Sequence, residues 1–186
     1  MTTPDLESQL AERGAILRGH FQLSSGRHAD TYVEKFRILQ WPDLTGQLCQ
    51  FIADHFRDKV NLVAGPTTGG VILAYETARH LGLRSIIAER ADSGTGREFK
   101  RGFEIGPGDN VLIVDDVLTT GGSIREVIDA VRARGAEVAG VAVLVDRTGG
   151  RVDFGVPFYA CITLDIASWP PEECQLCRDG VQLVVT

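Results

Sequence analysis

The chain has 186 residues and a formal net charge of −6, with 44% hydrophobic and 24% charged residues. These fractions are typical of globular proteins and exclude a disordered or collagen-like chain. The acidic balance argues against a nucleic-acid partner, which would require an excess of Lys and Arg. Because there is neither a basic and apolar leader nor an apolar run long enough to span a bilayer, we expect a cytoplasmic protein without a membrane partner.

The order of sequence patterns predicts a doubly wound α/β fold. A Thr-Pro-Asp signal predicts a short helix over 3–13, and Pro42 opens a second helix. From residue 60 onward, apolar runs rich in β-branched residues alternate with helical patterns. The predicted strands are 60–64, 84–88, 111–114 and 138–145, and the predicted helices between them are 71–81 and 123–134. This alternation indicates a mostly parallel sheet covered by helices, and the absence of a linker predicts a single domain over 1–186.

The turn that leaves the predicted strand 111–114 carries the strongest functional signal. Residues 111–123 read Val-Leu-Ile-Val-Asp-Asp-Val-Leu-Thr-Thr-Gly-Gly-Ser. The glycines and the start of the following helix favour a phosphate, whereas paired carboxylates would repel it unless they bind a ribose diol or Mg²⁺. The pattern therefore indicates a ribose phosphate. A P-loop and a dinucleotide fingerprint are excluded by spacing. The alternative is an ordinary capped turn in which Asp115 and Asp116 satisfy backbone groups.

The whole segment resembles the phosphoribosyl-diphosphate signature of the type I phosphoribosyltransferases, and a Thr at position 119 is typical of their orotate branch. The resemblance implies a mostly parallel twisted sheet with a small hood from about residues 1–40. It implies transfer of ribose 5-phosphate from 5-phospho-α-D-ribose 1-diphosphate (PRPP) to orotate, which gives orotidine 5′-phosphate and diphosphate in UMP synthesis. It also implies Mg²⁺, bound mainly through PRPP, with Asp115 and Asp116 as candidate additional ligands.

The resemblance assigns further roles residue by residue. Asp115 and Asp116 would hold the ribose diol, while Thr119 and Arg147 would face orotate. Arg147 follows the predicted strand 138–145, and a guanidinium fork suits a carboxylate, although an isolated Arg there would be read as a surface residue. The loop around the 5′-phosphate would comprise Val117, Leu118, Thr119, Thr120, Gly121, Gly122 and Ser123.

Two other segments support this interpretation. The turn 65–70, Gly-Pro-Thr-Thr-Gly-Gly, resembles the pyrophosphate loop of the family, although alone it would be a plain connection from strand to helix. Its candidate residues are Pro66, Thr67, Thr68 and Gly69. Residues 19–32 are similar to the element that forms the hood over the base in orotate enzymes. We expect His20 and His28 within it to be surface or structural residues.

The glycine-rich stretch 90–102 carries several cations and is predicted to be a flexible loop. In the family this loop reaches into the site of the neighbouring subunit, which implies a homodimer. Arg90, Lys100 and Arg101 are expected to act on pyrophosphate and, with the two aspartates, to form the catalytic set. Many orotate enzymes carry cations at three positions of this loop where this chain has Ala91, Gly94 and Gly96. Some also have Lys where this chain has Ser24. Arg97 is a further candidate to replace the missing cations. The alternative interpretation of the whole stretch is an exposed hairpin tip with solvated charges.

The four cysteines include one Cys-x-x-Cys pair, Cys174 and Cys177. The pair suggests a zinc half-site or a redox dithiol, but neither a second pair nor a His nearby in the sequence completes a zinc site. We expect reduced, structural thiols.

Two other functions remain open from the sequence. A purine or uracil salvage phosphoribosyltransferase would share the paired aspartates but not the need for Arg147 or the hood element. A regulator that binds PRPP without turnover would also fit, although the acidic charge argues against DNA binding.

Overall fold

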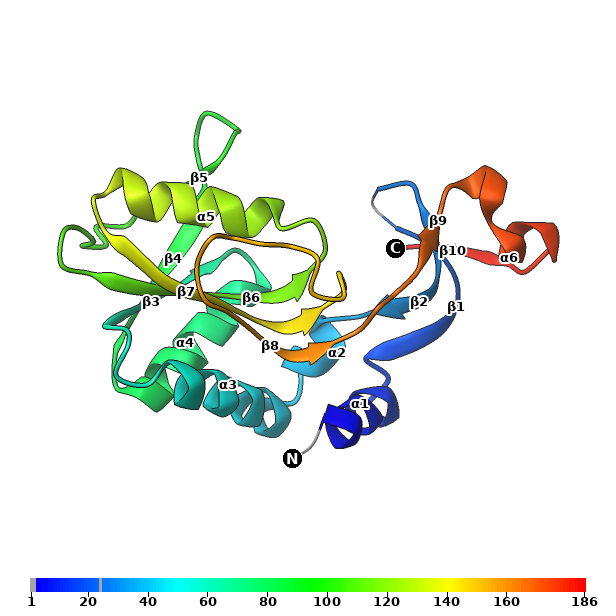
Figure 1. Ribbon diagram of the computed structural model, residues 1–186, viewed down its shortest axis with the longest axis horizontal. Coiled ribbons are helices and arrows are strands. Elements are labelled where there is room, and N and C mark those ends of the chain that lie inside the picture. Colours follow the sequence, from blue (N-terminus) through cyan, green and yellow to red (C-terminus); the bar gives the residue numbers. More distant parts are fainter. Residues whose placement is uncertain (1–2, 24) are drawn as a thin grey trace.

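The computed structural model describes residues 3–23 and 25–186, so Ser24 lies outside the described residues (Figure 1). A six-stranded sheet has the order β5-β4-β3-β6-β7-β8, and a four-stranded sheet has the order β10-β1-β2-β9. The strands of the large sheet are β3 (Leu62–Pro66), β4 (Arg84–Arg90), β5 (Arg97–Phe99), β6 (Asn110–Leu118), β7 (Glu137–Asp146) and β8 (Phe158–Thr163). Its neighbouring strands are parallel except for β4 and β5.

Helices cover both faces of the large sheet, as the sequence predicted. The helices α3 (Pro42–Phe56) and α4 (Gly69–Leu81) lie on one face and α5 (Gly122–Ala133) lies on the other (Figure 1). Side chains of β6 alternate between the two cores: Leu112 and Val114 belong to the α3–α4 core, and Val111 and Ile113 to the α5 core. This two-sided burial explains why the strand reads as a continuous apolar run. Edge strand β8 was not predicted, because no helical pattern separates it from β7.

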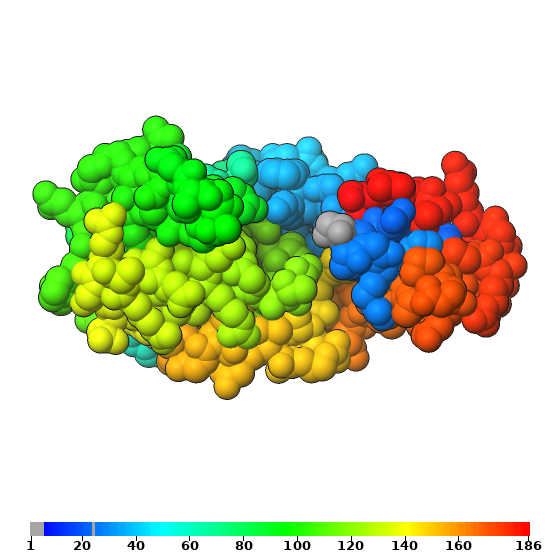
Figure 2. All heavy atoms as spheres, turned by 90° about the horizontal axis from the view of Figure 1, so that it is seen from above, coloured from blue at the N-terminus to red at the C-terminus, as the bar shows by residue number. Residues whose placement is uncertain are grey.

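The small sheet forms the hood, which we define as β1 (Ile16–Gln22), β2 (His28–Val33), β9 (Ser168–Trp169) and β10 (Leu183–Val185). Its strands β1 and β2 lie within the N-terminal segment from which we expected the hood. The C-terminal half was not predicted: β10 pairs in parallel with β1, and β9 pairs antiparallel with β2. Figure 2 shows the blue segment that contains β1 and β2 beside the orange and red C-terminal segment, at one end of an elongated molecule.

Short helices complete the chain. They are α1 (Thr3–Glu12), α2 (Phe36–Leu39), the 3-10 turn η1 (Pro171–Glu173) and α6 (Gln175–Arg178). The predicted helices over 3–13 and from Pro42 are confirmed. Across the described ranges, no helix combines the length and apolar character that a membrane span requires.

Candidate active site

A cavity of about 740 Å³ lies between the hood and the carboxyl edge of the large sheet. This is the edge where open α/β sheets bind ligands. The sheet side contributes several of the predicted residues, namely Asp116, Val117, Thr119, Thr120 and Arg147. The hood side contributes Leu23, Ser25, Arg27, Tyr32, Val33, Ser168 and Thr186.

Asp115 and Asp116 lie near the end of β6, where the strand reaches the cavity. The Asp116 carboxylate is buried and accepts a hydrogen bond of 2.7 Å from the Val117 backbone N–H. Asp115 accepts one of 2.9 Å from the Asp116 N–H. Burial, and then the neighbouring charge of Asp116, raise the pKa of Asp115 to about 7. Of the two residues, Asp116 lines the cavity.

Lys35 is a cavity residue that the sequence did not single out. Its ammonium lies 3.1 Å from Asp116 Oδ2, and it lines the cavity directly after β2. Nothing local to Lys35 signals this role, because its partner is far away in the sequence. The ammonium reduces the repulsion between the buried carboxylates and an incoming anion.

The turn from β6 into α5 forms a cradle that borders the cavity. Gly121 has a left-handed φ of 80° and precedes the first residue of α5. A Cβ there would lie 3.0 Å from the Phe154 ring, so glycine suits both the backbone and the space. Thr119 and Thr120 are exposed beside it and face the cavity. The helix N-terminus and these hydroxyls are suited to an anion.

The predicted pyrophosphate loop packs directly against the paired aspartates. A Cβ on Gly69 would lie 2.0 Å from Asp116 Oδ2, and a Cβ on Gly65 would lie 2.0 Å from the Gly70 carbonyl oxygen. Glycine is therefore required at both positions for the close approach. The peptide bond between Thr67 and Thr68 is cis. The structure thus brings together the 65–70 turn and the 115–123 segment.

Arg97 connects both loops to the β4–β5 hairpin. Its guanidinium donates hydrogen bonds of 3.0 Å to Thr67 Oγ1, to Ser123 Oγ and to the Ala88 carbonyl. Only 5% of its side chain is exposed. The sequence offered Arg97 as one of several substitutes for missing loop cations, and of these it is the one that contacts the loops.

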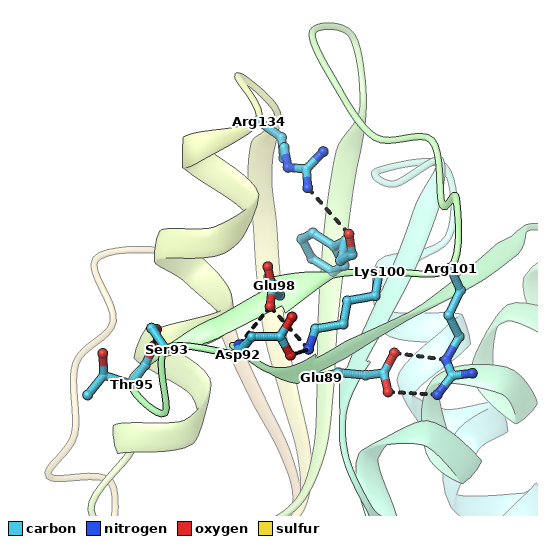
Figure 3. A network of polar contacts seen from close by, with 9 residues as sticks. Glu89, Asp92, Ser93, Thr95, Glu98, Lys100, Arg101 and Arg134 are labelled. Atoms are coloured by element: carbon cyan, nitrogen blue, oxygen red, sulfur yellow. Dashed lines mark hydrogen bonds and ion pairs between the residues drawn. The ribbon is translucent and has the colours of Figure 1, made fainter.

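The other predicted cations of the hairpin do not line the cavity. Figure 3 shows Lys100 and Arg101 directed at neighbouring carboxylates. Lys100 pairs with Asp92 and Glu98, and Arg101 meets Glu89 through two hydrogen bonds of 2.8 Å. These carboxylates raise the pKa values of both cations. Arg90 ends β4 and is exposed. The residues predicted to be a flexible loop include β5, and the turn of the hairpin projects from the sheet (Figure 1).

Arg147 enters the cavity immediately after β7 and stands near Tyr32. Burial lowers the pKa of its guanidinium. Its buried Nε has no hydrogen-bond partner within the described part of the chain. The preceding Asp146 is committed elsewhere, because it accepts bonds from the Thr148 N–H and hydroxyl and from the Gly150 N–H. Arg147 thus lines the cavity and carries one buried donor, Nε, that no group in the described part of the chain satisfies.

Comparison with known proteins agrees with this geometry. The model of the phosphoribosyl transferase domain matches residues 37–176. An orotate phosphoribosyltransferase of Caldanaerobacter subterraneus subsp. tengcongensis is 48% identical over 170 residues, which cover 91% of this chain and 88% of the relative. One of Pelotomaculum thermopropionicum is 46% identical over 185 residues, with coverages of 99% and 96%.

Solved structures give the same result. The orotate phosphoribosyltransferase of Aeropyrum pernix superimposes with a TM-score of 0.73 at 32% identity, covering 86% of this chain and 93% of that one. An adenine phosphoribosyltransferase of Rhodothermus marinus, at 24% identity, shares the fold with a TM-score of 0.68. This chain is therefore a member of the phosphoribosyl transferase family, in its orotate phosphoribosyltransferase branch.

Proposed function

We propose that this protein transfers ribose 5-phosphate from PRPP to orotate, releasing diphosphate and forming orotidine 5′-phosphate for UMP synthesis. The observation that carries the proposal is Arg147, a half-buried guanidinium whose Nε lacks a protein partner among the described residues. It shares one cavity with the Asp116 carboxylate and the phosphate cradle. A planar carboxylate on the base would satisfy that guanidinium, and adenine or uracil offers none.

The chain's own groups act by positioning and charge. Asp115 and Asp116 accept hydrogen bonds from the ribose diol, the 117–123 loop wraps the 5′-phosphate, and Thr119 with Arg147 orients orotate. As the anomeric bond loosens, positive charge develops on the sugar and negative charge on the departing diphosphate. No protein nucleophile is required, because orotate attacks the sugar directly.

Magnesium fits this arrangement as a partner of PRPP. Asp116 lines the cavity, and its buried Oδ2 accepts no hydrogen bond within the described residues, where the Lys35 ammonium is its ionic partner. A carboxylate oxygen is a ligand of the kind that Mg²⁺ prefers. When bound, the ion neutralises charge on the diphosphate oxygens. We propose that PRPP carries most of its ligands, with Asp115 and Asp116 as further ones.

The hairpin cations are proposed to bind the diphosphate after a change of partner. Lys100 and Arg101 would leave Asp92, Glu98 and Glu89, and Arg90 would join them, while the Pro66–Gly69 turn contacts the same group. The diphosphate carries more negative charge than a single carboxylate, so it attracts these cations more strongly. The cations can return to their carboxylates when the product leaves, as turnover requires.

We propose that these cations act across a homodimer. Large apolar side chains are exposed on the α2–α4 side of the molecule: Phe36, Trp41, Ile72 and Tyr75, the last 66% exposed. Such a cluster is typical of a subunit interface. Mixing a Lys100→Ala/Arg101→Ala chain with an Asp115→Asn/Asp116→Asn chain should restore part of the activity if the hairpin acts in trans. No restoration, in mixtures shown to exchange subunits, would place its action in cis.

The test of the reaction is a parallel assay with orotate, adenine, hypoxanthine and uracil, with PRPP and Mg²⁺ present. Consumption of orotate alone would support the proposal. Consumption of another base would favour a salvage enzyme, and PRPP binding without turnover would favour a sensor. We also propose a cytoplasmic location, which the four free thiols of the chain support because such thiols suit a reducing compartment.

A further inference from the structure

Four side chains from distant parts of the sequence converge within the hood. His20 lies on β1, His28 begins β2, Cys174 precedes α6 and Cys177 lies within α6. One nitrogen or sulfur atom from each lies within 4.8 Å of the others. His20, His28 and Cys174 are almost completely buried, while Cys177 closes the cluster toward solvent.

Four of the six distances between the donor atoms are close to those of a tetrahedral metal site. His20 Nε2 lies 2.9 Å from His28 Nδ1, 3.5 Å from Cys174 Sγ and 3.7 Å from Cys177 Sγ, and His28 Nδ1 lies 3.3 Å from Cys177 Sγ. Four ligands around zinc, at about 2.0–2.1 Å for nitrogen and about 2.3 Å for sulfur, are separated from one another by roughly 3.3–3.8 Å. Small adjustments of the two imidazoles would therefore complete the site.

The surroundings of His20 orient it as a ligand. Its Nδ1–H donates a hydrogen bond of 2.8 Å to the Val181 carbonyl, so Nε2 turns its lone pair toward the other three groups. Metal-bound histidines almost always have such an outer partner on the second ring nitrogen. Both thiols are free, so the pair Cys174 and Cys177 is available for coordination.

We propose that this cluster binds one Zn²⁺ ion with a structural role. Two thiolates and two imidazoles in tetrahedral arrangement are ligands that zinc favours, and four protein ligands leave no open position for catalysis. The ion would bind the C-terminal segment to β1 and β2. It would thereby fix β9 and β10, which pair with those strands and precede or follow the cluster.

The hood strands are the part of the molecule that such an ion would stabilise. Two of the four hood strands have only two or three residues, which provide little stability alone. Those strands carry Ser168 beside the cavity and are followed there by Thr186. Arg27 donates hydrogen bonds to the side chain and carbonyl of Ser168. A zinc ion would therefore hold the wall of the base cavity in place without touching the substrate.

The first test is the metal content of the reduced protein, purified without chelator and reconstituted with zinc. We expect one zinc per chain, and cobalt substitution should give the visible bands and sulfur-to-metal charge transfer of a tetrahedral thiolate site. A Cys174→Ser/Cys177→Ser variant should lose both signals. The matched control, Cys49→Ser/Cys161→Ser, should keep them. Reconstituted wild-type protein without stoichiometric metal, or cobalt bound without thiolate bands, would overturn the proposal.

The second test addresses the structural role and is independent of the catalytic assignment. Zinc should be removed with a chelator and excess Mg²⁺ restored before measurement. The melting temperature should then fall by several degrees, and proteolysis should become faster within residues 168–186. Re-addition of zinc should reverse both effects. If stoichiometric zinc can be removed without change in melting or proteolysis, the ion does not stabilise the hood.

Discussion

Lys35 and Asp116 form an ion pair of 3.1 Å that joins the hood side of the cavity to the end of β6. The Lys35 charge also acts on the adjacent Asp115, whose pKa it lowers against the larger effects of burial and of Asp116. The protonation state of the paired carboxylates therefore depends on Lys35, which lies outside the segment that contains them.

Replacement of Lys35 by Met should move the acidic limb of the kcat/KM profile for PRPP to higher pH. Loss of the ammonium raises the pKa of Asp115, so the ionised pair forms only at higher pH. We expect roughly a tenfold loss of kcat/KM at pH 7. Lys59→Met, whose ammonium donates to the His55 carbonyl, is the control and should leave the profile unchanged. If the acidic limb of the Lys35→Met profile did not shift, Lys35 would not control the pKa of Asp115.

Replacement of Asp115 by Asn should make the protein more stable and much less active. Because folding raises this pKa from 3.8 to about 7, the folded state binds the extra proton between these values and loses stability as pH rises through them. Asn removes that loss, so the melting temperature should rise by a few degrees at pH 8 and by less at pH 5. Thermal melts at both values measure this. A drop at pH 8 would show that Asp115 stabilises the fold in its charged form.

The double substitution Asp115→Asn/Asp116→Asn should abolish turnover with the fold intact, as judged by circular dichroism and a cooperative melt. The diol would lose both of its carboxylate acceptors. Retained turnover in this variant would rule out the assignment of the pair to the ribose.

Arg147→Lys should raise the KM for orotate by roughly 10²-fold and leave the KM for PRPP nearly constant. Lys keeps the charge but loses the planar fork that suits a carboxylate. Steady-state kinetics with each substrate varied in turn would measure the two constants. Arg57→Lys, at a surface pair with Asp54, is the matched control. Equal increases in both KM values would indicate a general disturbance of the cavity.

Gly69→Ala should disrupt the contact between the 65–70 turn and Asp116. The new Cβ would lie 2.0 Å from a buried carboxylate oxygen, so the loop must move. We expect a cost of about 2 kcal/mol in unfolding free energy and at least a 10²-fold loss of activity. Gly106→Ala has its nearest neighbour at 3.8 Å and should be tolerated in both chemical denaturation and assay.

The sequence by itself determined the features that lie within contiguous segments. The strand, paired acids, glycine turn and helix of residues 111–123 form one unit, so their residue types predicted both the local fold and the kind of ligand. The alternating apolar runs predicted the parallel sheet for the same reason, since each run had to be buried on two sides. The Thr119 and Arg147 assignments required the family resemblance in addition.

The tertiary structure decided which distant residues meet. Lys35 reaches Asp116, and Arg97 rather than Lys100 or Arg101 contacts the two loops, because strand pairing fixes where each side chain points. No histidine is near Cys174 in the sequence. The parallel pairing of β10 with β1 nevertheless brings His20 to that cysteine. Such contacts depend on the order of strands in the hood, which short edge strands with weak local signals do not reveal.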